Sequence, residues 1–302
     1  MYSLTTTKMC SKSFIETLLQ RAQLFADGKE PWKCNGTVVN VFFEPSTRTN
    51  LSFQMAAHRL GLHVLNFDCT NSSLKKGESM LDTLQTIEAL GANIAVIRSS
   101  EDWPAMELDK KVNISLVNAG SGVKDHPTQA LLDALTIKQH FGYFQGLTVT
   151  IVGDILHSRV ARSNIDVLTK LGAKIQLAGP EHYKADDLAT FVPWVDFDEA
   201  IEESDVVMML RVQHERHSEK FPYEIGEYHQ KFGLTQERVR RMKPNAIMMH
   251  PGPVNRGVEI ADEVLEDGRC KILQQVRNGV AVRMAVLEVC LLGERYGHLV
   301  SA

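Results

Sequence analysis

The chain has 302 residues, of which 44% are hydrophobic and 23% charged, and its formal net charge is −4. This length predicts about two globular domains. The acidic balance argues against a general nucleic-acid-binding protein, which usually carries a basic stripe, but it leaves room for a locally basic pocket.

The five cysteines are scattered along the chain and form no CxxC pair: Cys10, Cys34, Cys69, Cys270 and Cys290. This pattern argues against a disulfide framework or a zinc site and favours a reducing compartment. The first residues lack the apolar core of a signal peptide, and no run approaches the roughly 18 apolar residues of a membrane span. We therefore expect a cytoplasmic protein without a metal site and without a membrane partner.

The first half of the chain alternates short β-branched or aromatic runs with amphipathic helices, the order typical of an α/β fold with parallel sheets. The expected strands are residues 37–43, 63–67, 93–97 and 114–118, and the expected helices are 51–60, 81–90 and 127–142. Pro127 suits the first turn of the last of these helices, because its missing N–H would have no intrahelical partner there.

A second series follows, with strands expected at 147–152, 174–178, 205–210 and 246–249 and helices at 159–171 and 280–292. We expect two similar doubly wound parallel-sheet domains, joined by helices and separated by a cleft. The expected domains are 1–142 and 143–279, with a helix of about 280–302 packing back on the first. Ligands of such sheets bind beyond the carboxyl ends of the strands.

The most informative segment lies between the first strand and its helix, where Ser46-Thr47-Arg48-Thr49 supplies three hydroxyls and an arginine. A helix N-terminus has unpaired N–H groups and a partial positive charge, so these residues could hold a phosphate. Ordinary helix capping by Ser or Thr explains the same residues. Taken alone, so short a motif favours capping.

Other polar residues occupy similar places, after strands or before helices. They are Lys76 in a polar loop, Arg98 at a strand end, His126 and Gln129 around Pro127, Arg159, Arg211 with Gln213, and the stiff loop 250–257. Each has a simple structural explanation, such as a solvated surface or a turn. Together they place five cations, Arg48, Lys76, Arg98, Arg159 and Arg211, where a doubly wound fold has its ligand crevice. In a chain of negative net charge, this favours binding of strongly anionic small molecules.

Two of these motifs resemble those of the aspartate and ornithine carbamoyltransferases. Ser46-Thr47-Arg48-Thr49 resembles their carbamoyl phosphate signature, and His126-Pro127-Thr128-Gln129 resembles their second shared motif. Lys76 looks like the mobile-loop lysine of the aspartate enzymes, and Arg211-Val212-Gln213 looks like their aspartate-binding pair. Ornithine enzymes typically have His-Cys-Leu-Pro where this chain has His250-Pro251-Gly252-Pro253. The resemblance covers nearly the whole chain and favours the aspartate branch of the family.

The resemblance implies a cofactor-free transfer of the carbamoyl group from carbamoyl phosphate to L-aspartate, in de novo pyrimidine biosynthesis. Phosphate would be held by Ser46, Thr47, Arg48, Thr49 and Arg98, and the carbonyl oxygen would face Thr49, Arg98 and His126. The carbamoyl NH2 would be held by Gln129 and by the backbone of the segment Pro251, Gly252 and Pro253. The carboxylates of aspartate would be bound by Arg159, Arg211 and Gln213. Lys76, with Ser72 or Ser73, would come from the neighbouring subunit of a homotrimer. Arg48, Thr49, Lys76, Arg98 and His126 form the expected catalytic set.

Three alternatives stay open at this point. The acceptor could be ornithine or another amino acid, and regulatory chains could bind the trimer. A nucleotide-dependent oxidoreductase is a second alternative, because Val152-Gly153-Asp154 follows a strand, although GxGxxG is missing. A catalytically silent binding or scaffold protein is the third, although the full set of site residues argues against it.

Overall fold

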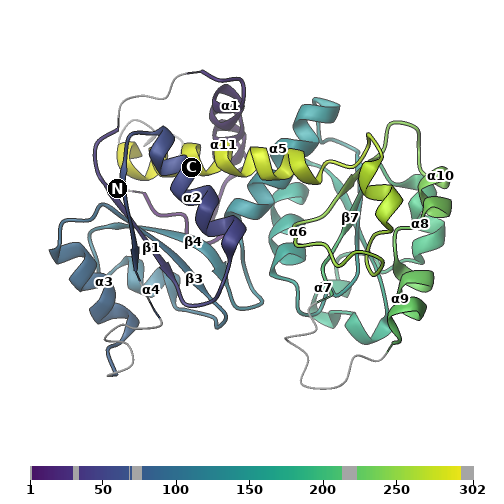
Figure 1. The fold of residues 1–302 in the computed structure, drawn as a ribbon, viewed down its shortest axis with the longest axis horizontal. Helices are drawn as coiled ribbons and strands as arrows, with labels where there is room; N and C mark the ends of the chain where they lie inside the picture. The colour runs from purple at the N-terminus through teal and green to yellow at the C-terminus, as the bar shows by residue number, and fades with distance from the viewer. Residues whose placement is uncertain (1, 30–33, 68, 70–76, 213–222, 294–302) are drawn as a thin grey trace. The chain divides into compact units, whose positions relative to one another are not determined.

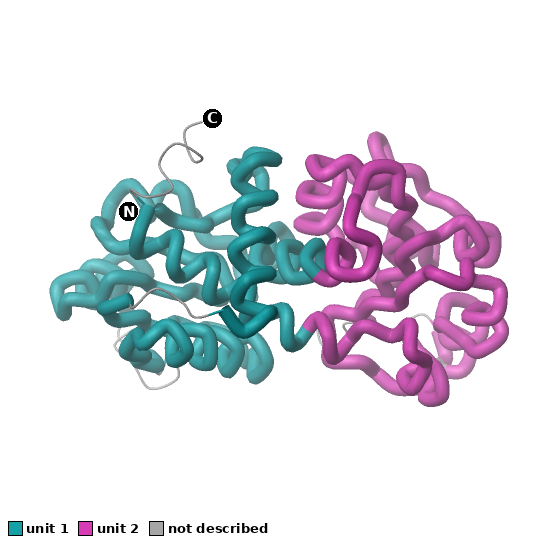
Figure 2. Tube along the Cα trace, turned by 90° about the horizontal axis from the view of Figure 1, so that it is seen from above, with its two compact units in different colours: residues 1–135, 276–302 teal, residues 136–275 magenta. Residues whose placement is uncertain are grey.

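The computed structural model describes residues 2–29, 34–67, 69, 77–212 and 223–293. The chain divides into two compact units, residues 1–135 with 276–302, and residues 136–275 (Figure 2). The long helices α5 (Pro127–Phe141) and α11 (Ile272–Leu292) each cross the boundary between them.

The first unit is built on a parallel sheet of β1 (Thr37–Phe42), β2 (His63–Phe67), β3 (Ile94–Ser99) and β4 (Ser115–Ser121), in the order β2-β1-β3-β4. Figure 1 labels β1, β3 and β4 of this sheet. Its other elements are η1 (Thr7–Met9), α1 (Lys12–Ala26), α2 (Thr47–Arg59), α3 (Met80–Ala89) and α4 (Ala105–Asp109). Successive strand residues face opposite sides. Val39 and Val41 of β1 pack with Leu84 of α3, while Asn40 donates to Asn50 of α2.

The second unit repeats this plan with β5 (Thr148–Val152), β6 (Lys174–Ala178), β7 (Val206–Met209) and β8 (Ile247–Met249), in the order β6-β5-β7-β8. Its helices are α6 (Arg159–Leu171), η4 (Glu181–Tyr183), α7 (Asp186–Ala189), α8 (Phe197–Glu203), α9 (Ile225–Phe232), α10 (Gln236–Arg241) and η6 (Asp262–Glu266). Phe197 and Ile201 of α8 share a core with Val207 and Met209 of β7.

Both sheets have the same crossover point. In the first, the chain moves from β1 outward to β2 and then returns to the other side of β1 as β3; β5, β6 and β7 do the same in the second. The strand order therefore reverses between β1 and β3, and between β5 and β7. Such switch points leave a crevice at the carboxyl ends of the strands, which is where ligands of open α/β sheets bind.

The predicted α/β class with two similar parallel-sheet halves is confirmed, and β2, β6 and α6 have the expected bounds. The predicted start of α2 was too late: the helix begins at Thr47, because the polar first turn carries no apolar periodicity. The last helix begins at Ile272 rather than near Val280. Gly279 lies inside this helix, and a Cβ there would lie 2.7 Å from Nη1 of Arg283, so close packing explains this glycine.

Helix α1 was not predicted, although its sequence contains the signals. Ser11 caps the helix by accepting from the N–H of Phe14, and Phe14, Ile15, Leu18 and Leu19 form a buried stripe at helical spacing. Within the part of the chain that the structure describes, no helix has the length and apolar character that a membrane crossing requires.

Candidate functional site

The turn from β1 into α2 differs from that of an ordinary capped helix. Ser46 occupies the N-cap position of α2, but its side chain makes no capping hydrogen bond in the described turn. Ser11, Ser79 and Ser158, at the same position of α1, α3 and α6, each accept a backbone N–H. Simple capping therefore does not explain the first motif. The positive end of the helix dipole favours an anion here.

The members of this motif differ in exposure. Thr49 is buried, Ser46 is half-buried, and Thr47 and Arg48 are exposed. An exposed guanidinium next to a helix N-terminus can form paired, charge-assisted hydrogen bonds with a phosphate.

Arg98 lies on the other side of the switch point, near the end of β3. Its Nε is 2.7 Å from Oε1 of Glu44, which follows β1, and its Nη1 donates to the carbonyl of Ala119 in β4 at 3.1 Å. The two charged side chains are only 13% and 14% exposed. The guanidinium is thus oriented by contacts from both neighbouring strands.

His126 and Gln129 lie where β4 leads into α5. His126 is buried, and its carbonyl accepts from the N–H groups of Gln129 and Ala130, so it immediately precedes the first helical turn at Pro127. Nε2 of Gln129 donates to Oδ1 of Asp133 at 3.0 Å, one turn later on the same helix. The second motif is therefore held rigidly at a helix N-terminus.

Arg283 of α11 connects the two helices that carry these motifs. Its Nη1 donates to Oγ of Ser52 in α2 at 2.8 Å, and its Nη2 lies 3.4 Å from Oγ1 of Thr128 in α5. Its guanidinium stacks over Phe53, with 5.0 Å to the ring centroid. Burial lowers the pKa of Arg283 to about 10, while the charge of Asp133 opposes that shift.

The prediction missed Arg283. The only signal in the sequence was a single arginine inside the apolar run of the last helix.

In the second unit, the turn from β5 to α6 carries Arg159. Ser158 caps α6 through its side chain, and Arg159 is the buried first residue of that helix. Asp154 is fully buried and lies 2.8 Å from Nδ1 of His157. Val152-Gly153-Asp154 is therefore part of a turn stiffened by a buried carboxylate.

Arg211 follows β7, and the loop 250–257 follows β8. The backbone N–H of Val212, next to Arg211, donates to Oε1 of Glu259 at 2.8 Å. In the loop, the N–H of Gly252 donates to Nδ1 of His250 at 2.8 Å. Glu259 was not among the predicted site residues. Its only sequence signal is an acidic residue between Val258 and Ile260, which is also typical of an exposed strand edge.

Most predicted residues thus lie beyond the carboxyl ends of strands, in two sets. Ser46, Thr47, Arg48, Thr49, Arg98, His126 and Gln129 belong to the first unit, and Arg159, Arg211, Gly252 and Pro253 to the second. Ser73, Lys76 and Gln213, as well as Ser72, lie outside the described residues.

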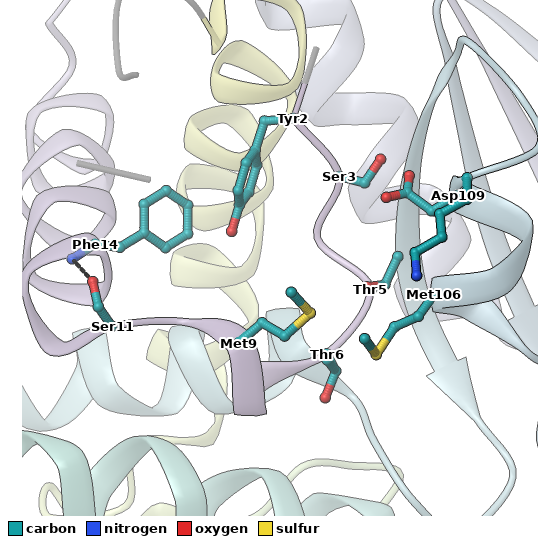
Figure 3. A pocket seen from close by; sticks show the side chains of 10 residues that line it. Tyr2, Ser3, Thr5, Thr6, Met9, Ser11, Phe14, Met106 and Asp109 are labelled. Carbon is teal, nitrogen blue, oxygen red and sulfur yellow. Dashed lines mark hydrogen bonds between the residues drawn. The ribbon is translucent and has the colours of Figure 1, made fainter. Parts of the chain in front are cut away.

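A pocket of about 250 Å³ occurs elsewhere in the first unit, beside the N-terminal segment (Figure 3). Tyr2, Met9, Phe14 and Met106 contribute its apolar lining, and Asp109 is one of its polar groups. It contains none of the predicted site residues. Among the residues that the structure describes, no group of three or more His, Cys, Asp or Glu side chains is arranged to hold a metal ion.

Two parallel four-stranded sheets with hydroxyl and cationic side chains at their switch points define a two-domain α/β protein suited to small anionic ligands. Comparison with known proteins identifies the family. Residues 3–139 match the carbamoyl-phosphate-binding domain, and residues 145–290 the aspartate/ornithine-binding domain, of aspartate/ornithine carbamoyltransferases. The chain belongs to the aspartate/ornithine carbamoyltransferase family.

Solved structures of aspartate transcarbamoylase from Trypanosoma cruzi are similar to the chain over most of its length. The complex with aspartate and phosphate is 30% identical, with a TM-score of 0.82, and the match covers 95% of this chain and 93% of that one. The complex with N-(phosphonacetyl)-L-aspartic acid is 31% identical, with a TM-score of 0.80 and coverage of 95% and 94%. The complex with carbamoyl phosphate is 30% identical, with a TM-score of 0.79 and coverage of 95% of each chain.

Proposed function

We propose that this protein is an aspartate carbamoyltransferase, which converts carbamoyl phosphate and L-aspartate into N-carbamoyl-L-aspartate and phosphate in de novo pyrimidine biosynthesis. The family relationship supports carbamoyl transfer, and Arg211 beyond β7 carries the choice of acceptor. A guanidinium can pair a carboxylate through two hydrogen bonds. The side-chain amine of ornithine would instead require an acidic partner.

The reaction needs positioning and charge stabilisation rather than a nucleophilic side chain. The neutral amine of aspartate attacks the carbonyl carbon of carbamoyl phosphate, and a tetrahedral intermediate with an oxyanion forms. The bond from that carbon to the phosphate oxygen then breaks, phosphate leaves, and the amine loses one proton. Hydrogen-bond donors fixed around the oxyanion and correct placement of the amine can supply most of the acceleration.

The residues of the first unit are proposed to bind carbamoyl phosphate. Ser46, Thr47, Arg48 and Thr49 hold its phosphate together with Arg98. Thr49, Arg98 and His126 stabilise the developing oxyanion, and Gln129 binds the carbamoyl NH2. The N-termini of α2 and α5 add partial positive charge near these residues. We assign residues 1–142, together with residues from about 280 to 302, to this carbamoyl phosphate domain.

The residues of the second unit are proposed to bind aspartate. Arg159, Arg211 and Gln213 pair with its two carboxylates, and the backbone around Gly252 and Pro253 also holds the carbamoyl NH2. We assign residues 143–279 to this domain. Glu259 holds the backbone N–H of Val212, next to Arg211, which supports a fixed backbone position for this arginine.

A homotrimer with shared active sites completes the proposal. Lys76, with Ser73 or Ser72, enters from the neighbouring subunit, in a ring where each subunit gives one loop and receives another. The scattered cysteines are consistent with a cytoplasmic enzyme.

A product assay tests the proposal directly. Purified protein is incubated with carbamoyl phosphate and either L-aspartate or L-ornithine, and carbamoylated amino acid and released phosphate are measured beside native mass. We expect N-carbamoyl-L-aspartate and phosphate in equal amounts, from a trimer. Carbamoylation of ornithine but not aspartate would overturn the choice of acceptor, and no product from either would overturn the activity.

A further inference from the structure

Glu259 is a buried carboxylate that lies between two segments carrying proposed substrate-binding groups. Its side chain is fully enclosed, and it belongs to the same unit as Arg211 and the loop 250–257. An uncompensated charge is strongly disfavoured inside a protein, so its partners indicate what it does.

Three N–H donors satisfy this carboxylate. Oε1 accepts from the backbone N–H of Val212 at 2.8 Å and from Nδ2 of Asn255 at 2.7 Å, and Oε2 accepts from the backbone N–H of Asn255 at 2.7 Å. Nδ2 of Asn255 also donates to the carbonyl of Val212 at 3.2 Å. Both polar groups of the Val212 backbone are therefore bound, directly after Arg211.

His250 extends the link to Gly252. Its Nδ1 accepts from the N–H of Gly252, so in the neutral ring the proton is on Nε2. That Nε2 lies 3.7 Å from Oε2 of Glu259, an electrostatic contact longer than a hydrogen bond. The backbone N–H of His250 is held in turn by Oε1 of Gln275 at 3.0 Å.

The arrangement connects the peptide after β7 to the loop after β8 through one charged group. Replacing buried charges by apolar residues is often neutral or stabilising, so such a group is weak evidence for a contribution to stability. A role in fixing the positions of the substrate-binding groups explains the buried carboxylate better, because carbamoyl transfer depends on correct placement of the amine and the carbonyl. Residues that lock binding groups through a second layer of hydrogen bonds provide this kind of order.

We propose that Glu259 is a positioning residue, which with Asn255 sets the place of Arg211 relative to the loop containing Gly252 and Pro253. We call the contacts of Glu259 and Asn255 with Val212 and with each other the Glu259 clamp. The expected changes in KM and kcat rest on the proposed function. The expected changes in amide exchange rest on the hydrogen bonds alone.

Glu259→Gln is the sharpest test. Glutamine keeps the shape but has one acceptor oxygen, so its NH2 group must face either the N–H of Val212 or that of Asn255. Asp205→Asn is the matched control in the same unit. Asp205 accepts from the N–H of Thr148 at 2.8 Å and pairs with Lys243 at 2.8 Å, but it precedes β7, whereas Arg211 follows that strand.

For Glu259→Gln we expect the KM for aspartate to rise and kcat to fall, each about tenfold, less than the hundredfold that a misplacement of about 1 Å can cost. The KM for carbamoyl phosphate should change less than about twofold, because the other unit is proposed to hold its phosphate. Asp205→Asn should lower the melting temperature about as much as Glu259→Gln does. It should leave kcat and both KM values nearly unchanged. Asn255→Ala removes the side-chain donor and leaves the carboxylate with its two backbone donors, and it should shift the same constants in the same direction.

Hydrogen–deuterium exchange gives a readout that does not need activity. The amides of Val212 and Asn255 should exchange faster in Glu259→Gln and at the normal rate in Asp205→Asn. Absence of product from the unmodified protein would overturn the proposed function, while the exchange experiment would still test the clamp. Two results would refute the clamp. The first is an unchanged exchange rate at Val212 together with an unchanged KM for aspartate in Glu259→Gln. The second is a loss of activity that, in all variants including Asp205→Asn, is proportional to the loss of melting temperature.

Discussion

Arg98 and Glu44 form an ion pair across the switch point of the first sheet, with 2.7 Å between Nε and Oε1. Arg98 lies near the end of β3 and Glu44 just after β1, so the pair is adjacent to the Ser46–Thr49 turn. The pair orients the guanidinium before an anion arrives. It also places a negative charge next to the proposed phosphate position.

We predict that Glu44→Gln strengthens binding of inorganic phosphate about fivefold at low salt. Glutamine keeps an oxygen that can accept from Arg98, while the repulsion between Glu44 and the anion is lost. For unit charges several ångströms apart near a protein surface, that repulsion is worth on the order of 1 kcal/mol. Isothermal titration calorimetry measures the change, which should shrink as salt is added.

Glu16→Gln is the control for this prediction. It removes one unit of charge from an exposed position on α1, where Glu16 pairs loosely with Lys12 at 4.0 Å. Phosphate affinity should not change in that variant. Weaker phosphate binding in Glu44→Gln would contradict the prediction. It would mean that Glu44 helps binding more by orienting Arg98 than it hinders binding by repelling the anion.

We predict that His126→Ala lowers kcat about a hundredfold, since one lost oxyanion donor commonly costs roughly 3 kcal/mol at the transition state. The KM for carbamoyl phosphate should rise far less, because the phosphate keeps its other partners. His140→Ala is the matched control: it lies in the last turn of the same helix and contacts Asn245. A normal kcat in His126→Ala would assign His126 a structural role.

We predict that Arg211→Ala raises the KM for aspartate more than a hundredfold while binding of carbamoyl phosphate stays nearly constant. Loss of a bidentate, partly desolvated carboxylate partner commonly costs about 3 kcal/mol or more. Arg211→Lys should recover little, because an ammonium cannot reproduce the planar pair of donors. Arg256→Ala, at an exposed arginine paired with Asp262, should be close to normal. Collapse of carbamoyl phosphate binding in Arg211→Ala would show that the two substrates are assigned to the wrong units.

The sequence predicted the strands and the turns between them well, because buried parallel strands are apolar runs bounded by polar turns. It therefore correctly placed Arg48 and Arg211 after strands and Arg98 near the end of one. Whether these residues act on the proposed substrates remains a prediction until the variants are measured.

The residues that support the site could not be predicted in the same way. Arg283 bonds to Ser52 and Thr128, and Glu259 bonds to Val212, across 231, 155 and 47 positions of sequence. Their partners are a hydroxyl or a backbone N–H, and no local pattern specifies a contact with such common groups. The same holds for the bidentate pair between Arg21 and Glu288, which joins helices at opposite ends of the chain.

We predict that Arg21→Ala lowers the free energy of unfolding by about 3–5 kcal/mol, because it leaves the buried carboxylate of Glu288 without its charged partner. Nε and Nη2 of Arg21 lie 2.6 and 2.7 Å from the two oxygens of Glu288, which is fully buried. Denaturant unfolding measures the change. Replacing both residues, as Arg21→Met with Glu288→Leu, should restore most of the stability. Lys12→Ala, which breaks an exposed pair, should cost about 0.5 kcal/mol or less, and an equally small loss in Arg21→Ala would contradict the prediction.

Sharing of active sites between subunits predicts a specific result for mixed trimers. Arg48 lies in the first turn of α2, whereas Lys76 lies outside the described residues, so the prediction rests on the proposed homotrimer. Arg48→Ala and Lys76→Ala should each be nearly inactive as pure trimers. The two variants are unfolded together in equal amounts, allowed to reassemble, and assayed.

Each site of a closed ring would draw Arg48 from one chain and Lys76 from the next. Each native residue is then present with a chance of one half, so about one quarter of the sites should be intact after random assembly. Recovery of about one quarter of normal activity is the expected result, with native mass spectrometry showing that the trimers are mixed. Activity that stays at the level of the single variants in mixed trimers would mean that Lys76 serves the site of its own chain.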